Sequence, residues 1–558
     1  MTMDSQERTT SDTTLADQET ADTASGAALS PEQSSTPPGK RAAGLSGFSR
    51  DFLVGLGMVL AMALYYVIGN PNIAYTGIIA RVNPLVSLPF LLIFLVLCWY
   101  RLPLALALLP LALPYYLHPK TVFDQYNFSL AEITLLVCVL VAGVQLILWQ
   151  TTWRYWLSWR ELWDRVGPFS IPIVVYVAVA ALSILGAYDG HVALRGLREF
   201  VIEPLLYLLL LLYCFRSRKD LIRLFIAFLA TACVIGLLAL AQYLFFRSAL
   251  GVDVDGLVRP ASVYGSANDL GILFDYTLPF AMAFVIVDTG RVIGASRALW
   301  LRILALVYCL FAVLILFLLQ SLGTWVAMAV AVLFLGALSL PNRRALLVSA
   351  AVFVVCVAAV ALVFHTKIID FVFTHHVNAS NISTTQKRLY LWQAAWHMFK
   401  DYPLLGVGLN NWSCHYSLNT VCSTPHLRHY WITLIPGTNF PTGVTEEPGL
   451  QPHNDILNVV VSIGIFGLLA YFAVIAMFYW LFARITQHIG RVKDAGLLRW
   501  MVIGVGTAFL AALVQGQVDS AFLMQDDAYL FWALVAALLL LRVFSATPWR
   551  SSRQVTKT

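Results

Sequence analysis

The sequence is poor in charged residues. Asp, Glu, Lys and Arg make up 12% of the 558 residues, whereas hydrophobic residues make up 59%. A soluble domain carries about 25% charged residues, and a soluble chain of this length would form roughly three or four domains whose surfaces need covering. So few charges argue against a soluble enzyme, a nucleic-acid binder and a disordered hub. The class that remains is an all-α, polytopic helical membrane protein.

Long apolar runs support this class. A bilayer core needs about 20 apolar residues per helix. Arg101 interrupts the second and third runs, which are both short, so we expect 12–14 transmembrane helices, with no convincing internal repeat. The candidate spans lie near 52–69, 84–99, 102–117, 129–149, 170–187, 200–215, 221–246, 270–288, 302–320, 323–340, 345–365, 455–482, 500–516 and 527–545.

The basic residues predict an orientation. If the N-terminus is cytoplasmic, alternate connections face the cytoplasm, and these carry the arginine and lysine clusters, as the positive-inside rule requires. An error in one span would reverse every later connection, so the agreement supports cytoplasmic N- and C-termini. The clusters are Arg154/Arg160/Arg165, Arg216/Arg218/Lys219, Arg291/Arg297, Arg343/Arg344, Arg484/Arg491/Lys493 and Arg550/Arg553/Lys557.

The same assignment of spans divides the chain into five parts. The first 40 residues carry a net charge of −5 and no aromatic residue, which predicts a disordered cytoplasmic tail over 1–45. No apolar run follows a basic start before Phe52, so a signal peptide is not expected. The remaining predicted parts are helices 1–11 (46–365), a large extracytoplasmic helical loop (366–452), helices 12–14 (453–546) and a basic cytoplasmic tail (547–558).

The loop 366–452 is too long for an ordinary connection, and such loops tend to be functional. It contains or borders eight of the eleven histidines, but it lacks HExxH and CxxC patterns, so no metal and no other cofactor is predicted. Cys414 and Cys422 are the two cysteines outside apolar runs. A disulfide between them is possible outside the cytoplasm, and the alternative is two free thiols.

Two motifs in or beside the loop carry candidate chemistry. Leu389, Trp392, Trp396 and Phe399 recur at spacings of three and four, which predicts a helix over 384–400 lying on the membrane surface. Arg388 lies at its start, where the alternative role is a solvated surface charge.

The second motif is Gln451-Pro452-His453-Asn454-Asp455, directly before a span. Asn454 or Asp455 is a suitable N-cap. The positive end of the helix dipole then disfavours a charged His453 ring, and a neutral imidazole can accept a proton near pH 7. The alternative is an interfacial histidine with a structural hydrogen bond.

Three further arginines lie on the predicted outer side, against the general bias. Arg259 precedes the span at 270–288, and Arg195 and Arg198 precede a span that carries Glu203 one turn in. The guanidinium fork suits phosphate, and a lipid diphosphate is an anion found at that depth. The alternative for Arg198 is a local pair with Glu203.

These segments resemble the O-antigen ligase/polymerase family of bacterial envelope glycan assembly. The resemblance covers roughly 190–480 and is strongest from Arg388 to Leu469, where LYLWQAAWHMF, DYPLLGVGLNNW and HNDILNVVVSIGIFGLL follow in order. The segment RPASVYGSANDLGILFDYTLPF resembles the family's upstream segment, with Ala267 in place of its proline. A family arginine expected near 320–325 is missing.

The resemblance implies a glycosyltransferase in the bacterial inner membrane. It would transfer a glycan from undecaprenyl diphosphate, without metal and with inversion, to lipid A–core, to another lipid-linked glycan or to a protein hydroxyl. By position, His453, Arg388 and Arg259 match essential family residues. His453 would be the base, with Glu446 and Glu447 as rivals or substrate ligands. Trp392, Trp412, Arg195 and Arg198 would contact substrate.

Two other classes stay open from the sequence alone. A secondary transporter or flippase would bind its substrate near the bilayer midplane, whereas the ionisable residues here gather at the outer side. A peptidoglycan-type polymerase would rely on an outer carboxylate.

Overall fold

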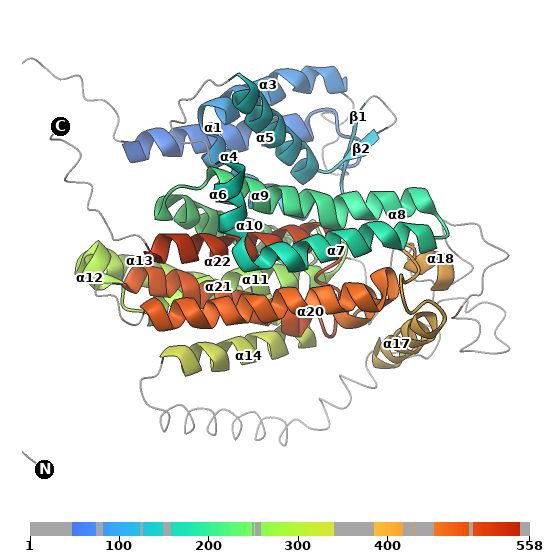
Figure 1. Cartoon of the computed structure of the whole chain (residues 1–558). Coiled ribbons are helices and arrows are strands. Elements are labelled where there is room, and N and C mark those ends of the chain that lie inside the picture. The colour runs from blue at the N-terminus through green and yellow to red at the C-terminus, as the bar shows by residue number, and fades with distance from the viewer. Residues whose placement is uncertain are drawn as a thin grey trace, which may run out of the picture. The chain divides into compact units, whose positions relative to one another are not determined.

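The computed structural model describes residues 47–73, 82–122, 126–148, 158–247, 250, 258–339, 384–416, 430, 451–489 and 495–546. Nearly all of them are helical (Figure 1). The described strands form one short antiparallel hairpin, β1 (Lys120–Val122) with β2 (Tyr126–Phe128).

Ten described helices are long and apolar enough to cross a membrane, so the prediction of an all-α polytopic membrane protein is confirmed. They are α1 (Gly47–Val67), α5 (Leu130–Ile147), α6 (Trp159–Val166) continued by α7 (Ser170–Leu182), α10 (Arg218–Phe245), α11 (Ala267–Ile286), α13 (Ala295–Leu319), α14 (Leu322–Ser339), α20 (Asp455–Ile489), α21 (Gly496–Gln515) and α22 (Gln525–Ala546).

The described spans differ from the fourteen candidates at two places, and a further candidate is not described. The runs 84–99 and 102–117 form a helix pair, α3 (Leu88–Tyr100) and α4 (Leu102–Leu108) with their flanking turns, bent by 118° at Arg101. Counted as one broken span, this pair raises the described total to eleven. The run 200–215 contains α9 (Glu203–Cys214), which continues α8 (Gly190–Leu197) through the π-turn η5 (Arg198–Ile202). The run 345–365 lies outside the described residues.

The bend at Arg101 has an electrostatic partner. The Arg101 Nη2 atom lies 3.0 Å from Asp51 Oδ1, and Arg223 of α10 pairs with the same carboxylate. An arginine in mid-span would be costly in lipid, so the chain turns there and places the guanidinium beside an acid.

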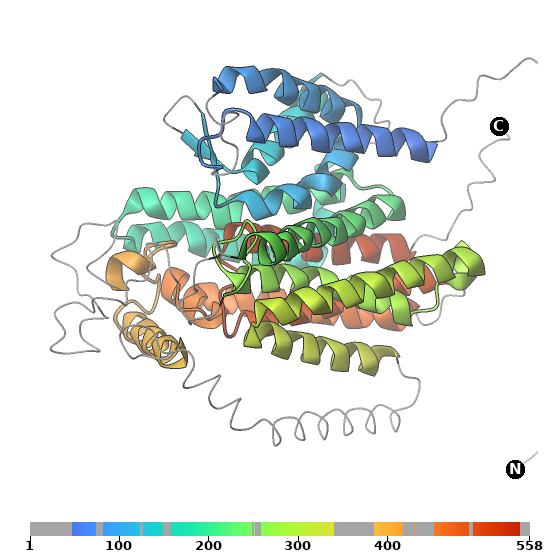
Figure 2. The ribbon, with the colours of Figure 1, turned by 180° about the vertical axis from the view of Figure 1, so that it is seen from behind.

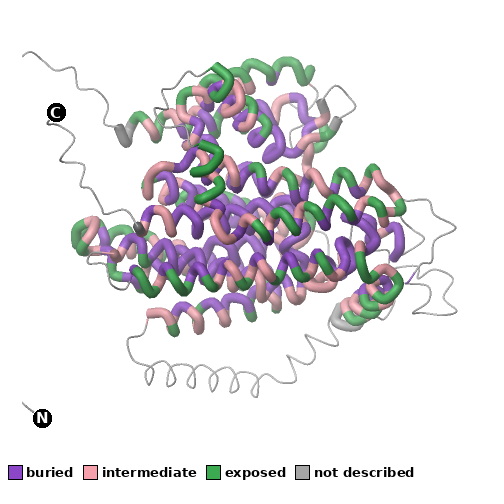
Figure 3. Tube along the Cα trace, viewed as in Figure 1, coloured by how far each residue is buried: buried purple, intermediate pink, exposed green. Residues whose placement is uncertain are grey.

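Helix α22 forms the centre of the bundle. Its residues from Ala528 to Leu541 are almost completely buried, and it packs against α9, α20 and α21. In contrast, α13 exposes large apolar side chains such as Leu304 and Leu310, as expected of a helix that faces lipid. Buried residues gather in the middle of the bundle (Figure 3). The helices run side by side, and Figures 1 and 2 show α17 (Thr384–Asp401) and α18 (Trp412–Tyr416) at the end opposite α12 (Gly290–Ile293).

Candidate functional site

The turn before α20 fixes the position of His453. The Asn454 side chain accepts a hydrogen bond from the Leu457 N–H at 3.0 Å, so it is the N-cap that the motif predicted. Its amide nitrogen donates to the Gln517 carbonyl at 2.9 Å. The backbone of His453 has a φ of 50°, which is uncommon for a residue other than glycine.

A second set of hydrogen bonds holds the connection between α21 and α22 against this turn. The buried Asp455 carboxylate accepts from the Ala521 and Phe522 N–H groups at 2.8 and 3.0 Å. Its own N–H donates to the Gly516 carbonyl at 2.6 Å. These hydrogen bonds therefore fix residues 516–522 against the start of α20.

This connection brings Asp519 to His453. The Asp519 Oδ1 atom lies 2.7 Å from His453 Nδ1, and Oδ2 lies 3.9 Å from Arg388 Nη2. The Asp519 side chain is 5% exposed, while His453 and Arg388 are each 27% exposed. His453 and Arg388, which were predicted separately from the sequence, thus lie beside the same carboxylate. Asp519 itself was not predicted. We call His453, Asp519 and Arg388 the outer cluster, after the side of the membrane on which the sequence predicts them.

Charge in the outer cluster is set by competing effects. Burial disfavours the ionised Asp519, but the charge and hydrogen bond of His453, the Arg388 guanidinium and the Ser520 N–H outweigh it and hold the pKa of Asp519 below its ordinary value. An ionised carboxylate can only accept hydrogen bonds, so in its contact with His453 the proton is carried by Nδ1.

Helix α17 carries Arg388, and its bounds agree with the prediction. The side that packs against α20 differs from the predicted face: Leu391, Ala394, Ala395 and Met398 are buried, whereas Leu389 and Trp396 are 49% and 53% exposed. The alanines allow close approach to α20. Of the predicted apolar stripe, Leu389 and Trp396 are exposed, whereas Trp392 and Phe399 are half buried against the side chains around Leu391. The position of α17 on the membrane surface stays a prediction.

The turn after α17 attaches it to α20 at a break in that helix. Gly464, inside α20, has a φ of 71°, so the surrounding backbone groups lose their helical partners. The Val461 carbonyl instead accepts from the Val407 N–H at 2.8 Å, and the Ile465 N–H donates to the Pro403 carbonyl at 2.9 Å. The turn after α17, which includes Gly406–Gly408, therefore supplies the hydrogen-bond partners of the broken helix.

Arg195 and Arg198 lie among carboxylates. Arg195 Nε lies 2.7 Å from Glu199 Oε1, and Arg198 pairs with Glu132 at 2.7 Å, Glu199 at 2.8 Å and Glu203 at 3.6 Å. The local Arg198–Glu203 pair, which was the alternative, is present. A substrate role for either arginine stays a prediction.

Arg259 lies in the segment before α11 and is half buried. The ion pairs described for Asp519 come from His453 and Arg388, so the convergence of Arg259 on the outer cluster stays a prediction.

Several other candidates are only partly described. Glu446, Glu447 and Cys422 lie outside the described residues. Cys414 is buried and disulfide-bonded, and its pairing with Cys422 stays a prediction. Trp392 is half buried on α17. Among the described residues, no group of three or more His, Cys, Asp or Glu side chains could hold a metal ion.

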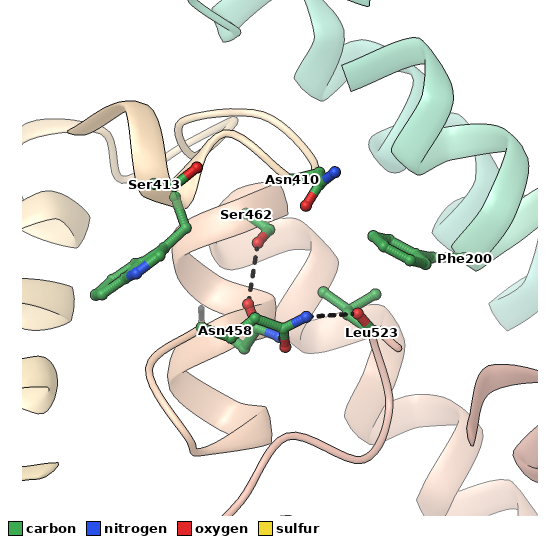
Figure 4. A pocket seen from close by; sticks show the side chains of 8 residues that line it. Phe200, Asn410, Ser413, Asn458, Ser462 and Leu523 are labelled. Atoms are coloured by element: carbon green, nitrogen blue, oxygen red, sulfur yellow. Dashed lines mark hydrogen bonds between the residues drawn. The ribbon is translucent and has the colours of Figure 1, made fainter. Parts of the chain in front are cut away.

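A recess lies where four segments close to His453 and Asp519 in the chain or in space meet (Figure 4). Its volume is about 300 Å³, including space open to solvent. The lining comes from η5, the turn leading into α18, the start of α20 and the α21–α22 connection. The lining residues are Phe200, Asn410, Trp412, Ser413, Gln451, Asn458, Ser462 and Leu523.

Comparison with known families agrees with the resemblance found in the sequence. Residues 307–472 match the model of a family described as O-antigen ligase. This range contains Arg388 and His453, whereas Arg259 and Asp519 lie outside it. No curated protein matches the chain.

Proposed function

Because the chain carries an O-antigen ligase domain over residues 307–472, we propose that it transfers a glycan from undecaprenyl diphosphate to an acceptor hydroxyl. The transfer takes place on the outer face of the bacterial inner membrane, needs no metal and inverts the anomeric centre. The observation that carries the proposal is the meeting of His453 and Arg388 on the buried Asp519.

The outer cluster suits the proton transfer in this reaction. Asp519 accepts the hydrogen bond of His453 Nδ1 and so directs the free electron pair to Nε2. Nε2 takes the proton of the acceptor hydroxyl while the hydroxyl oxygen forms a bond to the anomeric carbon. The His453 ring thereby becomes an imidazolium, which the adjacent Asp519 carboxylate stabilises.

Arg388 suits the departing group. The bond between the anomeric carbon and the phosphate oxygen breaks, and its electron pair moves onto the diphosphate. A guanidinium fork stabilises that charge, and the loss of one such donor costs about 10²- to 10³-fold in kcat. Arg259 is the proposed second cation. A diphosphate leaves readily, so the reaction needs no strong general acid.

The position of the outer cluster favours transfer over transport. A secondary transporter binds its substrate near the bilayer midplane between broken helices. Here His453 lies in the turn before α20, Asp519 in the α21–α22 connection and Arg388 on α17.

Reconstitution tests the proposal. The full chain in vesicles receives a glycan on undecaprenyl diphosphate together with lipid A–core, a second lipid-linked glycan or a protein acceptor, and product size is measured. We expect one acceptor to be extended, and His453→Ala to abolish this extension at normal protein level. His191→Ala, an exposed histidine at the start of α8, is the matched control. Full activity of His453→Ala would remove this residue from the mechanism.

A further inference from the structure

The described residues that line the recess beside the outer cluster are uncharged. Five of these eight residues carry amides or hydroxyls. We propose that the recess is a subsite for an uncharged sugar ring of the glycan donor or acceptor. This inference rests on the proposed function and names the class of sugar that the site accepts.

One wall of the recess is a fixed amide network (Figure 4). Gln451 Nε2 donates to the Leu523 carbonyl at 2.9 Å, and Asn458 donates to Gln451 Oε1. The Ser462 hydroxyl donates to Asn458 Oδ1 at 3.3 Å. Asn458 and Ser462 are each 3% exposed. Because these groups hold one another, the wall offers its remaining hydrogen-bonding positions in fixed directions.

The facing wall has unused hydrogen-bonding groups. The side chains of Asn410 and Ser413 make no hydrogen bond with other described residues, and the buried indole N–H of Trp412 has no acceptor among them. A buried polar group without a partner is costly. Asn410 and Ser413 thus offer polar groups to one recess, which is the arrangement a ligand rich in hydroxyl groups would complete.

This facing wall is held firmly in place. The Asn411 side chain accepts from the Asp189 N–H at 2.9 Å and donates to the Asp189 carbonyl at 3.2 Å. Asn410 itself has a φ of 58°, a left-handed conformation in which asparagine is among the more tolerant residues. The polar side chains of Asn410 and Ser413 therefore lie beside a residue, Asn411, that hydrogen bonds hold in place.

The recess also provides an apolar surface. Phe200, on the π-turn η5, presents its ring from the side opposite Asn410 and Ser462 (Figure 4). Single π-turns inside helices are frequent at functional sites. A sugar ring has a face of C–H groups and an edge of hydroxyls, so it matches one aromatic wall and two polar ones. A phosphate or carboxylate would lie there without a counter-charge.

The recess and the outer cluster share two chain segments. Gln451 and His453 are two residues apart, Asp519 and Leu523 are four apart, and the Asn454–Gln517 hydrogen bond joins the segments. A sugar held in the recess would thus lie next to the group that accepts the hydroxyl proton.

Direct binding tests this inference. The full chain in lipid nanodiscs is titrated with maltose and N,N′-diacetylchitobiose as neutral probes and with glucuronate as an anionic probe, by saturation-transfer NMR. We expect the neutral probes to bind and glucuronate to bind at least about tenfold more weakly. Ser413→Val and Asn410→Leu should each weaken neutral binding by about tenfold, as the loss of a buried hydrogen bond implies. Ser296→Val, at an exposed serine on α13, is the control.

The outcomes separate the two proposals. Loss of neutral binding in Ser413→Val with retained binding in His453→Ala supports the subsite, even if His453→Ala still transfers glycan and the proposed reaction fails. Equal binding by the unsubstituted protein and Ser413→Val, equal binding of glucuronate, or no neutral binding at all would overturn the subsite. In a transfer assay, Ser413→Val should raise KM, whereas His453→Ala should remove kcat.

Discussion

At the residue scale, Asp519 contacts both the His453 imidazole and the Arg388 guanidinium. We expect both the charge and the shape of this carboxylate to matter for glycan transfer. In Asp519→Asn, the amide can present its N–H₂ to the ring and favour the wrong tautomer of His453. We expect kcat of glycan transfer to fall by about 10²- to 10⁴-fold with a smaller change in KM. Initial rates of the reconstituted enzyme measure this. Asp164→Asn, at an exposed aspartate, should leave kcat unchanged, and so would Asp519→Asn if the carboxylate were merely structural.

The same carboxylate predicts a pH dependence of stability. The pKa of Asp519 lies below its ordinary value in the folded protein. Its stabilising contribution is therefore complete above the unfolded value of about 3.9 and is lost as pH falls through the folded pKa. The difference in melting temperature between the unsubstituted protein and Asp519→Asn should be largest near pH 7 and shrink below about pH 4. A difference that stays constant with pH would contradict this assignment of charge.

Arg388 is the residue whose geometry, rather than charge alone, is expected to matter. Lysine keeps the charge but offers a point donor in place of a planar fork, so Arg388→Lys should lose about 10²-fold in kcat/KM. The control is Lys400→Arg, which makes the reverse change at an exposed position on the same helix. Turnover by Arg388→Lys at the rate of the unsubstituted protein would indicate a simple surface charge.

Sequence reasoning found His453 and Arg388 because each lies in a local pattern, before a capped span or at the start of an amphipathic helix. Asp519 has no such pattern, and it is 66 residues away from His453 along the chain. The hydrogen bonds from Ala521 and Phe522 to Asp455 create its proximity to His453. The usable signal was weaker: an acid in a short polar connection on the same predicted side as His453.

At the scale of elements, the break in α20 and the turn after α17 depend on each other. A Cβ on Gly464 would lie 1.9 Å from the Leu404 carbonyl oxygen, and one on Gly406 would lie 2.3 Å from the Val461 carbonyl oxygen. Both glycines also have positive φ. Either alanine must separate the turn from the helix, which moves the Arg388-bearing α17 away from the outer cluster.

Gly464→Ala and Gly406→Ala should therefore each lower the free energy of unfolding by at least about 1–3 kcal/mol and reduce glycan transfer. Thermal unfolding in detergent and the reconstituted assay measure both effects. Gly143→Ala is the control, because a Cβ there meets nothing within 4 Å and the position is helical. Unchanged stability in both variants would show that the turn and the helix separate at little cost.

The bounds of α17 were predictable, whereas its buried face was not. The helix has two apolar stripes, one of large residues including Trp396 and one with Ala394 and Ala395 at its centre. Hydrophobic periodicity gives greater weight to the large residues. Packing against α20 selects the stripe with the small side chains, because that stripe allows the two backbones to approach closely.

At the scale of the whole molecule, hydropathy predicted the spans that run straight, and the expected range of 12–14 left open how the two short runs beside Arg101 are arranged. In the structure these runs form one pair of helices bent by 118°. Tertiary contact with Asp51, from a different helix, accompanies that bend. Such a partner cannot be read from the local pattern.

Charged groups at several helix ends are arranged to complement the helix dipoles. At one end, α11, α20 and α22 begin with acids in their first turns. At the other, arginine side chains donate to the last carbonyls of spans: Arg302 to Val287, Arg165 to Leu212 and Arg218 to Phe544. Both arrangements complement the helix dipoles. The arginine end is the one that the positive-inside rule assigns to the cytoplasm.

This orientation predicts which positions a membrane-impermeant maleimide can reach in spheroplasts. Single cysteines are introduced at exposed residues of opposite ends, His191→Cys at the start of α8 and Ser296→Cys at the start of α13. His191→Cys should be labelled in intact spheroplasts, and Ser296→Cys only after permeabilisation. The unsubstituted protein gives the background from its own cysteines. Labelling of Ser296→Cys in intact spheroplasts would reverse the bundle and place the outer cluster in the cytoplasm, where a lipid-linked glycan that has already crossed the membrane could not reach it.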